Sequence, residues 1–168
     1  LGDPNFVNFD LDEILSDKNI EDILNKINLN SCCDVGDLNI PAHPETIYLT
    51  VVDKDLNSVS IINSVCYVFG SGITTNKSGI LLHNRGTNFR VEHGHPNCIE
   101  GLKRPLHTII PGMVIDKDNN ATLSYGVMGG QYQPVGQVHV LNNMIDYGMG
   151  PQEALSFPRA FHFNNIYK

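Results

Sequence analysis

Apolar side chains near the start of the chain recur at intervals of three and four residues. They are Leu11, Ile14, Leu15, Ile20, Ile23, Leu24 and Ile27. This spacing puts them on one face of an α-helix and predicts one or two amphipathic helices over residues 10–28. Ser16 or Asp17 can cap the second helix, because either side chain accepts hydrogen bonds from the unpaired amides at a helix start. The periodicity disappears between residues 30 and 45, where two Cys, Gly36 and two Pro predict an irregular linker.

The period of the pattern changes to two after residue 45. Residues 46–52 and 58–65 are rich in β-branched and aromatic side chains, and the five residues between them have turn chemistry. Together they predict a long β-hairpin. Residues 113–116 and 121–126 flank a polar turn in the same way and predict a second hairpin, while residues 80–82 predict a short buried strand.

The rest of the pattern predicts a loop and two helices. Residues 90–112 are rich in Gly and Pro and predict a long structured loop. Helical spacing returns over residues 135–147, and residues 151–156 predict a short helix with Pro151 in its first turn. The order helix, hairpin, hairpin, helix predicts an α+β fold of packed layers.

Composition and charge exclude several classes of partner. A chain of 168 residues that is 41% hydrophobic supports one compact core. The formal net charge of −7 provides no basic face over the whole chain, so we predict no nucleic-acid partner. No apolar run approaches the roughly 18 residues that cross a bilayer, so we predict no membrane segment.

The charge is unevenly distributed along the chain. Residues 1–45 carry ten acidic and two basic side chains, whereas residues 46–168 carry eight acidic and nine basic ones. Such a shift indicates a boundary between two roles near residue 45. An acidic surface helix in front of a neutral domain produces the same pattern.

The cysteines and histidines predict no metal site. The four cysteines include an adjacent pair and no CxxC pattern, which is typical of free thiols in a reducing compartment and favours the cytoplasm over the periplasm. The pattern closest to a metal cluster is His93, His95 and Cys98, but the Gly and Pro between them indicate a loop. We predict neither a metal nor a cofactor.

Three features could carry chemistry. If the chain were cut before Thr46, the new α-amino group, with an ordinary pKa of about 7.7–8.0, could take the proton of the Thr46 hydroxyl; in an uncut chain Thr46 only begins a strand. Gly129 and Gly130, between a strand and a helix, form either an ordinary turn or a pair of converging N–H groups that suits an oxyanion hole. Arg85, in a polar loop, suits a substrate carboxylate or an ion pair.

Five separated motifs resemble the γ-glutamyltranspeptidase family in order and spacing. They are Glu45–Asp55, Phe69–Gly72, Gly79–Gly86, Lys103–Thr108 and Gly126–Gly130, and the closing Glu153-Ala154 and Pro158-Arg159 also fit. The resemblance covers about residues 46–163. It implies an N-terminal-nucleophile hydrolase with a four-layer αββα sandwich.

The resemblance also implies a precursor that cleaves itself between Glu45 and Thr46. Residues 1–45 would be the C-terminal end of the large subunit, and residues 46–168 the small, catalytic subunit, shortened at its C-terminus. The two subunits would remain together as a heterodimer. Thr46 would then attack a γ-glutamyl amide such as glutathione and pass the acyl group to water, an amino acid or a peptide.

Roles for the residues around the nucleophile follow from the same resemblance. Ser64 occupies the position of a hydroxyl that supports the nucleophile, and Gly129 and Gly130 occupy that of the oxyanion hole. His107 and Thr108 stand where the family commonly has two Ser that bind the substrate α-carboxylate.

Three positions depart from the well-known transpeptidases. Those enzymes carry Asn at position 66, Gln at position 85 and Asp at position 88, which bind the α-amino and α-carboxylate groups of the γ-glutamyl residue. Here Asn88 is a neutral partner for the substrate ammonium, Arg85 favours an anionic substrate, and Cys66 replaces the Asn.

This pattern is similar to the branch of the family that includes cephalosporin and glutaryl acylases. The first alternative is therefore an acylase of the same fold that acts on another carboxylate-bearing amide. The second is a non-catalytic α+β binding domain.

The sequence opens at Leu1 without Met or a leader pattern, so we expect a processed piece or a fragment. By the resemblance, most of the large subunit is absent, together with an Arg that binds the substrate carboxylate. We therefore expect this piece alone not to form a complete active site.

Overall fold

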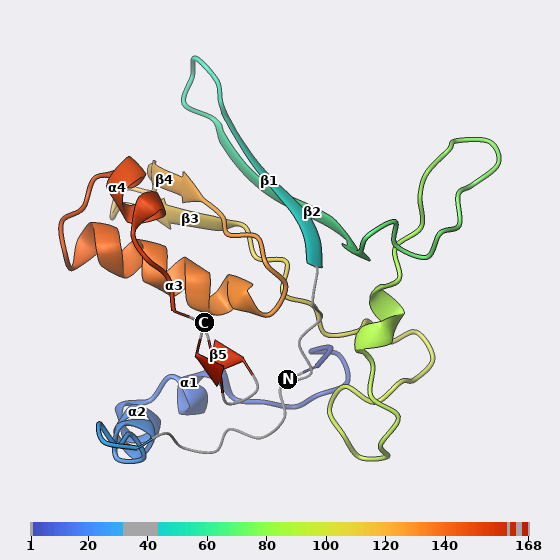
Figure 1. Ribbon diagram of the computed structural model, residues 1–168, viewed down its shortest axis with the longest axis horizontal. Helices are drawn as coiled ribbons and strands as arrows, with labels where there is room; N and C mark the ends of the chain where they lie inside the picture. The colour runs from blue at the N-terminus through green and yellow to red at the C-terminus, as the bar shows by residue number, and fades with distance from the viewer. Residues whose placement is uncertain (1, 32–43, 161, 164–165, 168) are drawn as a thin grey trace. The chain divides into compact units, whose positions relative to one another are not determined.

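The computed structural model describes residues 2–31, 44–160, 162–163 and 166–167 (Figure 1). The chain divides into two compact units. The first unit combines Leu1–Asn39, Asn88–Leu106 and Asn164–Ile166, and the second combines Ile40–Thr87, His107–Phe163 and Tyr167–Lys168. Most of the predicted processing linker lies outside the described residues.

Two short capped helices begin the first unit. They are α1 (Leu11–Ile14) and α2 (Asp17–Leu24). The Asp10 carboxylate accepts a hydrogen bond from the Asp12 amide at 2.9 Å, and the Ser16 hydroxyl accepts one from the Asn19 amide at 3.2 Å. The prediction of one or two helices is confirmed, since there are two, and Ser16 rather than Asp17 caps the second.

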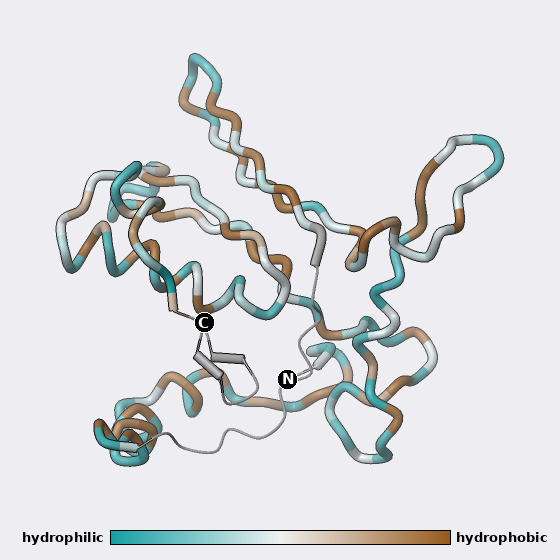
Figure 2. Tube along the Cα trace, viewed as in Figure 1, coloured by the Kyte–Doolittle hydropathy of each residue, from teal (hydrophilic) through white to brown (hydrophobic). Residues whose placement is uncertain are grey.

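Two antiparallel hairpins form the frame of the second unit. The first pairs β1 (Pro44–Val52) with β2 (Ser58–Tyr67), and the second pairs β3 (Gly112–Ile115) with β4 (Ala121–Tyr125). Apolar and polar positions alternate along β1 and β2, as the period of two predicted (Figure 2).

The turns of both hairpins are held by an Asp carboxylate. Asp53 accepts hydrogen bonds from the Asp55 and Asn57 amides at 2.8 and 2.9 Å, and Asp116 makes the equivalent bonds in the second hairpin. Because hydrogen bonds stabilise the ionised form, the pKa of each carboxyl lies below its ordinary value, with Asn57 and Asn120 as the main donors.

Hydroxyl groups join the two hairpins. The Tyr48 hydroxyl lies 2.8 Å from Ser124 Oγ and 3.1 Å from Ser60 Oγ, and Thr50 Oγ1 donates to Ser124 Oγ at 2.8 Å. Ser60 Oγ in turn donates to the Gly112 carbonyl at 3.0 Å. These bonds fix β1 and β2 against β3 and β4.

Two helices follow the second hairpin. α3 (Tyr132–Ile145) buries Gln133, Gly136, Gln137, Val140 and Asn143, and α4 (Pro151–Ser156) begins with the predicted Pro. The remaining elements are η1 (Arg85–Asn88), β5 (His162–Phe163) and β6 (Ile166–Tyr167). α3 begins three residues before its predicted start, because its first turn continues directly from the turn at Gly129 and Gly130.

The prediction of a short buried strand over residues 80–82 is wrong. Leu81 makes a single bridge to Thr74, while Ile80 is 60% exposed and Leu82 44% exposed. This apolar run pairs within its own loop and is not taken into a sheet.

The mixture of helices and hairpins confirms the α+β class. The described residues contain three two-stranded sheets, and the four-layer sandwich remains a prediction. Among these residues no helix combines the length and apolar character needed to cross a membrane.

Candidate active site

Thr46 lies at an irregularity in the first hairpin. Glu45 pairs with Cys66, but Ile47 pairs with Asn63, so one residue of β1 faces two residues of β2. A bulge of this kind bends the strand and aims a side chain away from the regular ladder. Thr46 is half-buried there, and it lies opposite Ser64 and Val65.

The end of β2 supplies two further groups beside the bulge. Ser64 Oγ accepts a hydrogen bond from the Cys66 amide at 3.0 Å. Cys66 is buried and has a φ of +81°, a conformation that is uncommon for a residue other than Gly. The Ser64 bond holds this strained turn, so the bulge is a built feature of the strand end.

Asn84 attaches the predicted carboxylate-binding loop to the same strand end. Its Oδ1 accepts from the Tyr67 amide at 3.1 Å, and its own amide donates to the Val65 carbonyl at 3.2 Å. Arg85 follows directly and is half-buried. Its Nη2 is shielded from solvent and has no hydrogen-bond partner among the described residues. A shielded guanidinium nitrogen without a partner favours an anion, because the desolvated donor otherwise remains unsatisfied.

Gly129 and Gly130 form the turn between β4 and α3. Their φ angles are +128° and +57°, and the first of these is a conformation that only Gly adopts readily. Their carbonyls accept from the Tyr132 and Gln133 amides at 3.0 and 3.1 Å, which starts the helix. Their own amides donate to no other group in the described ranges, and they lie at the positive end of a helix of 14 residues.

Tyr48 brings strand β1 to the start of this glycine segment. A Cβ atom on Gly126 would collide with the Tyr48 ring, so the Gly126 backbone lies directly against that ring. Thr46 and Tyr48 are two residues apart on one strand and share a face, at a separation of about 7 Å. The structure therefore brings Thr46, Ser64, Arg85 and the segment ending at Gly130 into one unit.

Of the other predicted binding residues, His107 and Thr108 belong to the same unit as Thr46, and Asn88 does not. His107 is exposed and Thr108 half-buried, in the irregular segment before β3, and none of the hydrogen bonds above joins them to Thr46. Asn88 belongs to the first unit, where its Nδ2 donates to the Leu106 carbonyl at 3.1 Å.

The described residues contain no group of three or more His, Cys, Asp or Glu that could hold a metal ion. His95 instead accepts the Asn97 amide through Nδ1 at 3.0 Å, and Cys98 Sγ lies 3.7 Å from the Ile99 carbonyl. Both residues shape a loop.

Sequence reasoning missed the role of Tyr48 and of two buried polar residues, Asp3 and Asn97. In the sequence, Tyr48 indicated only an aromatic residue typical of a strand. Asp3 and Asn97 are 4% and 3% exposed, and each lies in a segment without periodicity. The only available signal was the Pro next to each of them, which indicates a turn but not burial.

This arrangement can support attack by a hydroxyl on an amide. Thr46 supplies an oxygen at a bulge, Ser64 lies across from it, and two backbone amides at a helix start can donate hydrogen bonds to a developing negative charge.

The family model described as Gamma-glutamyltranspeptidase matches residues 1–167. A Glutathione hydrolase-like YwrD proenzyme of Bacillus subtilis is 38% identical over 164 residues, covering 95% of this chain and 30% of the relative. An Oxamate amidohydrolase proenzyme of Klebsiella pneumoniae is 31% identical, covering 94% of this chain and 29% of the relative.

A solved structure, the cephalosporin acylase of Bacillus halodurans, superimposes with a TM-score of 0.81 at 35% identity. The match covers 98% of this chain and 29% of that one. The chain thus spans about 30% of the length of the curated relatives it matches.

Proposed function

The chain belongs to the γ-glutamyltranspeptidase family, and we propose on that basis that it forms part of an amidohydrolase whose nucleophile is Thr46. The precursor cleaves itself between Glu45 and Thr46. Residues 1–45 then end the large subunit, and the catalytic subunit begins at Thr46. The substrate is a γ-glutamyl amide such as glutathione.

The proposed reaction uses the α-amino group and the side-chain hydroxyl of the same residue, Thr46. The α-amino group that cleavage exposes takes the proton from Thr46 Oγ, and Oγ attacks the amide carbonyl carbon. The Gly129 and Gly130 amides donate to the oxyanion of the tetrahedral intermediate. The C–N bond breaks, the proton passes to the departing amine, and water or an acceptor amine then cleaves the acyl ester.

One observation supports this proposal most directly. The Tyr48 ring packs on Gly126, so the strand that starts at the Thr46 bulge is fixed against the segment that ends in the Gly129–Gly130 turn. Unpaired amides at that turn are what an oxyanion requires, and an ordinary strand-to-helix turn has no need of a φ of +128°.

Thr46→Ala tests the proposal in the full-length protein. It removes the attacking oxygen, so we expect loss of both self-cleavage and amide turnover, measured by intact mass and by release of p-nitroaniline from γ-glutamyl-p-nitroanilide. Thr122→Ala is the matched control, because Thr122 is an exposed strand threonine whose Oγ1 donates to the Val114 carbonyl. Normal cleavage and turnover in Thr46→Ala would contradict the mechanism and favour a non-catalytic binding domain.

A second function, an acylase for another carboxylate-bearing amide, is favoured by Arg85. Its unpaired Nη2 suits a substrate carboxylate, and the solved neighbour with the TM-score of 0.81 is named a cephalosporin acylase. A glutaryl anilide, which lacks the α-amino group, separates the two functions. Turnover of it equal to or faster than that of the γ-glutamyl anilide supports the acylase.

Arg85→Gln then tests the residue itself. Because a hydrogen bond to a charged group contributes about 1.5–3 kcal/mol, we expect kcat/KM for the glutaryl anilide to fall at least tenfold. An unchanged value would remove Arg85 from the carboxylate site.

A further inference from the structure

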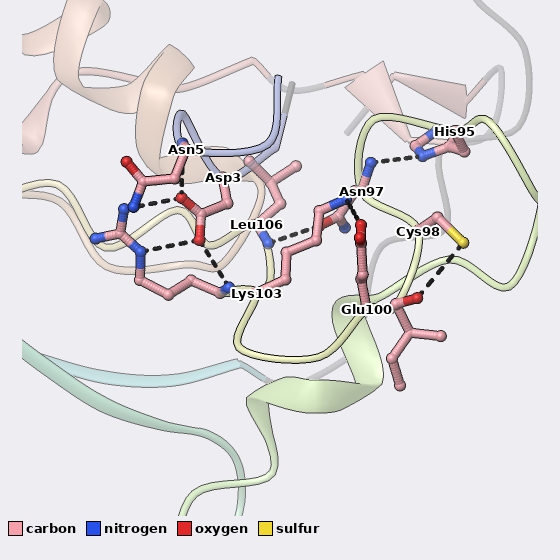
Figure 3. A network of polar contacts seen from close by, with 10 residues as sticks. Asp3, Asn5, His95, Asn97, Cys98, Glu100, Lys103 and Leu106 are labelled. Atoms are coloured by element: carbon pink, nitrogen blue, oxygen red, sulfur yellow. Dashed lines mark hydrogen bonds and ion pairs between the residues drawn. The ribbon is translucent and has the colours of Figure 1, made fainter. Parts of the chain in front are cut away.

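The segment that follows Asn88 is organised around one buried side chain, Asn97. Its Nδ2 donates to the Asn88 carbonyl at 2.7 Å, and its Oδ1 accepts from the Leu106 amide at 2.9 Å. Its backbone is also fixed, because the amide donates to His95 Nδ1 at 3.0 Å and the carbonyl accepts from the Arg90 amide at 2.9 Å. Asn97 therefore ties both ends of the loop together (Figure 3).

A second buried side chain, Asp3, holds the same loop from the start of the chain. Its Oδ2 accepts from the Arg104 amide at 2.8 Å and from Arg104 Nε at 3.1 Å, and its Oδ1 accepts from Arg104 Nη2 at 2.9 Å (Figure 3). This bidentate pair fixes the direction of Arg104 as well as its position.

Further contacts hold residues 2–6 against the loop that contains Asn97. A Cβ atom on Gly2 would collide with the Pro96 carbonyl, so the backbone at Gly2 lies against the residue that precedes Asn97. The Lys103 ammonium lies 5.2 Å from the centre of the Phe6 ring and 3.8 Å from Glu100 Oε2. Residues 2–6 and 96–106 are therefore packed as one body.

These anchors determine the orientation of the Asn88 side chain. Its Nδ2 donates to the Leu106 carbonyl, and the Leu106 amide donates to Asn97 Oδ1. Arg104, two residues before Leu106 in the chain, is bonded to Asp3. Asn88 Oδ1 accepts no hydrogen bond from another described residue. An amide fixed in this way presents an acceptor, which suits an ammonium group and not a carboxylate.

We infer that Asp3 and Asn97 are positioning residues that hold Asn88 with its Oδ1 turned to the ammonium group of an α-amino-acid substrate. The inference rests on the proposed function, in which Asn88 binds the γ-glutamyl α-amino group. It also gives the large subunit a part in substrate recognition, because Asp3 lies before the proposed cleavage point and Asn88 after it.

Binding to purified full-length protein tests this without requiring turnover. L-Glutamate and glutarate differ by the α-amino group alone, and calorimetry gives the dissociation constant of each. Asn97→Ser shortens the side chain and breaks both bonds, so we expect about tenfold weaker glutamate binding, with glutarate binding changed less than twofold. Asn120→Ser, which removes a comparable Asn from the second hairpin turn, leaves both constants unchanged.

Asp3→Asn is a second, independent test of the inference if the Asn97→Ser protein does not fold. It keeps the shape of the side chain and loses the charge, and the same selective loss of glutamate affinity is expected, with Asp116→Asn as the matched control. Equal weakening of both acids, or no change, overturns the inference, and so does a wild-type protein that binds neither acid. Failure of the proposed function is distinguished by intact mass, which reports cleavage before Thr46 whatever the acids do.

Discussion

The two units hold their proposed site residues by different means. In the second unit, Thr46 lies at a strand bulge and Gly129 and Gly130 lie at a helix start, so backbone conformation defines the positions of all three. In the first unit, Asn88 is held through buried side chains, with Asn97 and Asp3 bonded to the backbone of the loop that follows it. The groups proposed for bond breaking therefore depend on backbone geometry, and the Asn88 amide proposed to bind the ammonium group depends on side-chain hydrogen bonds.

This difference predicts different responses to mutation. A site residue positioned by backbone conformation is displaced when a substitution adds an atom that cannot be accommodated, because protein interiors are packed without spare volume. A site residue held by side-chain hydrogen bonds is displaced when a buried donor or acceptor loses its partner, because the desolvated group remains unsatisfied. Changes of the first kind should reduce kcat or fold stability, and changes of the second kind should alter substrate preference or acid sensitivity.

Among the changes that test this difference, the largest effect is expected for Gly129→Ala in the cleaved full-length protein. A φ of +128° is unfavourable for Ala, so the turn must change and the Gly129 amide must leave its direction. Loss of one oxyanion donor lowers kcat about 10²-fold or more, measured with γ-glutamyl-p-nitroanilide. Gly148→Ala is the control, since Gly148 also has a positive φ of +67° but open space around it; equal losses in both variants would count against the oxyanion role.

A smaller effect is expected for Gly126→Ala. The added methyl group meets the Tyr48 ring, and overpacking of this kind costs about 1–3 kcal/mol of stability. Denaturant unfolding of the full-length protein measures the change. Gly86→Ala, at a position with open space around it, serves as the comparison. A Gly126→Ala protein as stable as wild type would show that Tyr48 does not fix β1 in this way.

The smallest effect is expected in the pH dependence of stability, to which Asp3 contributes in the first unit. Bonds from Arg104, and secondarily from Asn5, hold the pKa of Asp3 well below its ordinary value. A depressed folded-state pKa adds stability above the unfolded-state value of about 4, and this is lost as the pH falls toward the folded value. We expect Asp3→Asn to flatten this acid dependence, followed by unfolding measured between pH 7 and pH 2. A profile in Asp3→Asn as steep as that of the wild type would contradict it.

The same contrast explains what sequence could predict. The β1–β2 and β3–β4 hairpins, two helices before residue 28 and the Pro at the start of α4 all follow from local periodicity and capping, and each is confirmed. The prediction of a buried strand at residues 80–82 was wrong because apolar content alone does not show whether a partner strand is present. The packing of Tyr48 on Gly126 joins positions far apart in the chain, and no local pattern contains it.

The loop from Asn88 to Leu106 was the least predictable region. Its order comes from single bonds between side chains and backbone, such as Asn97 to Leu106 and Asp3 to Arg104, which leave no repeat in the sequence. Of the predicted site residues, all except Asn88 lie within the second unit. The roles of all the site residues, including Asn88, His107 and Thr108, remain predictions.

N-terminal sequencing of the purified full-length protein, with intact mass, tests the central proposal most directly. If the amine and the hydroxyl of one residue act together, the preparation contains two chains, and the smaller one begins Thr-Ile-Tyr-Leu at Thr46. A single polypeptide that persists after prolonged incubation, or a smaller chain that begins at any other residue, would contradict the account.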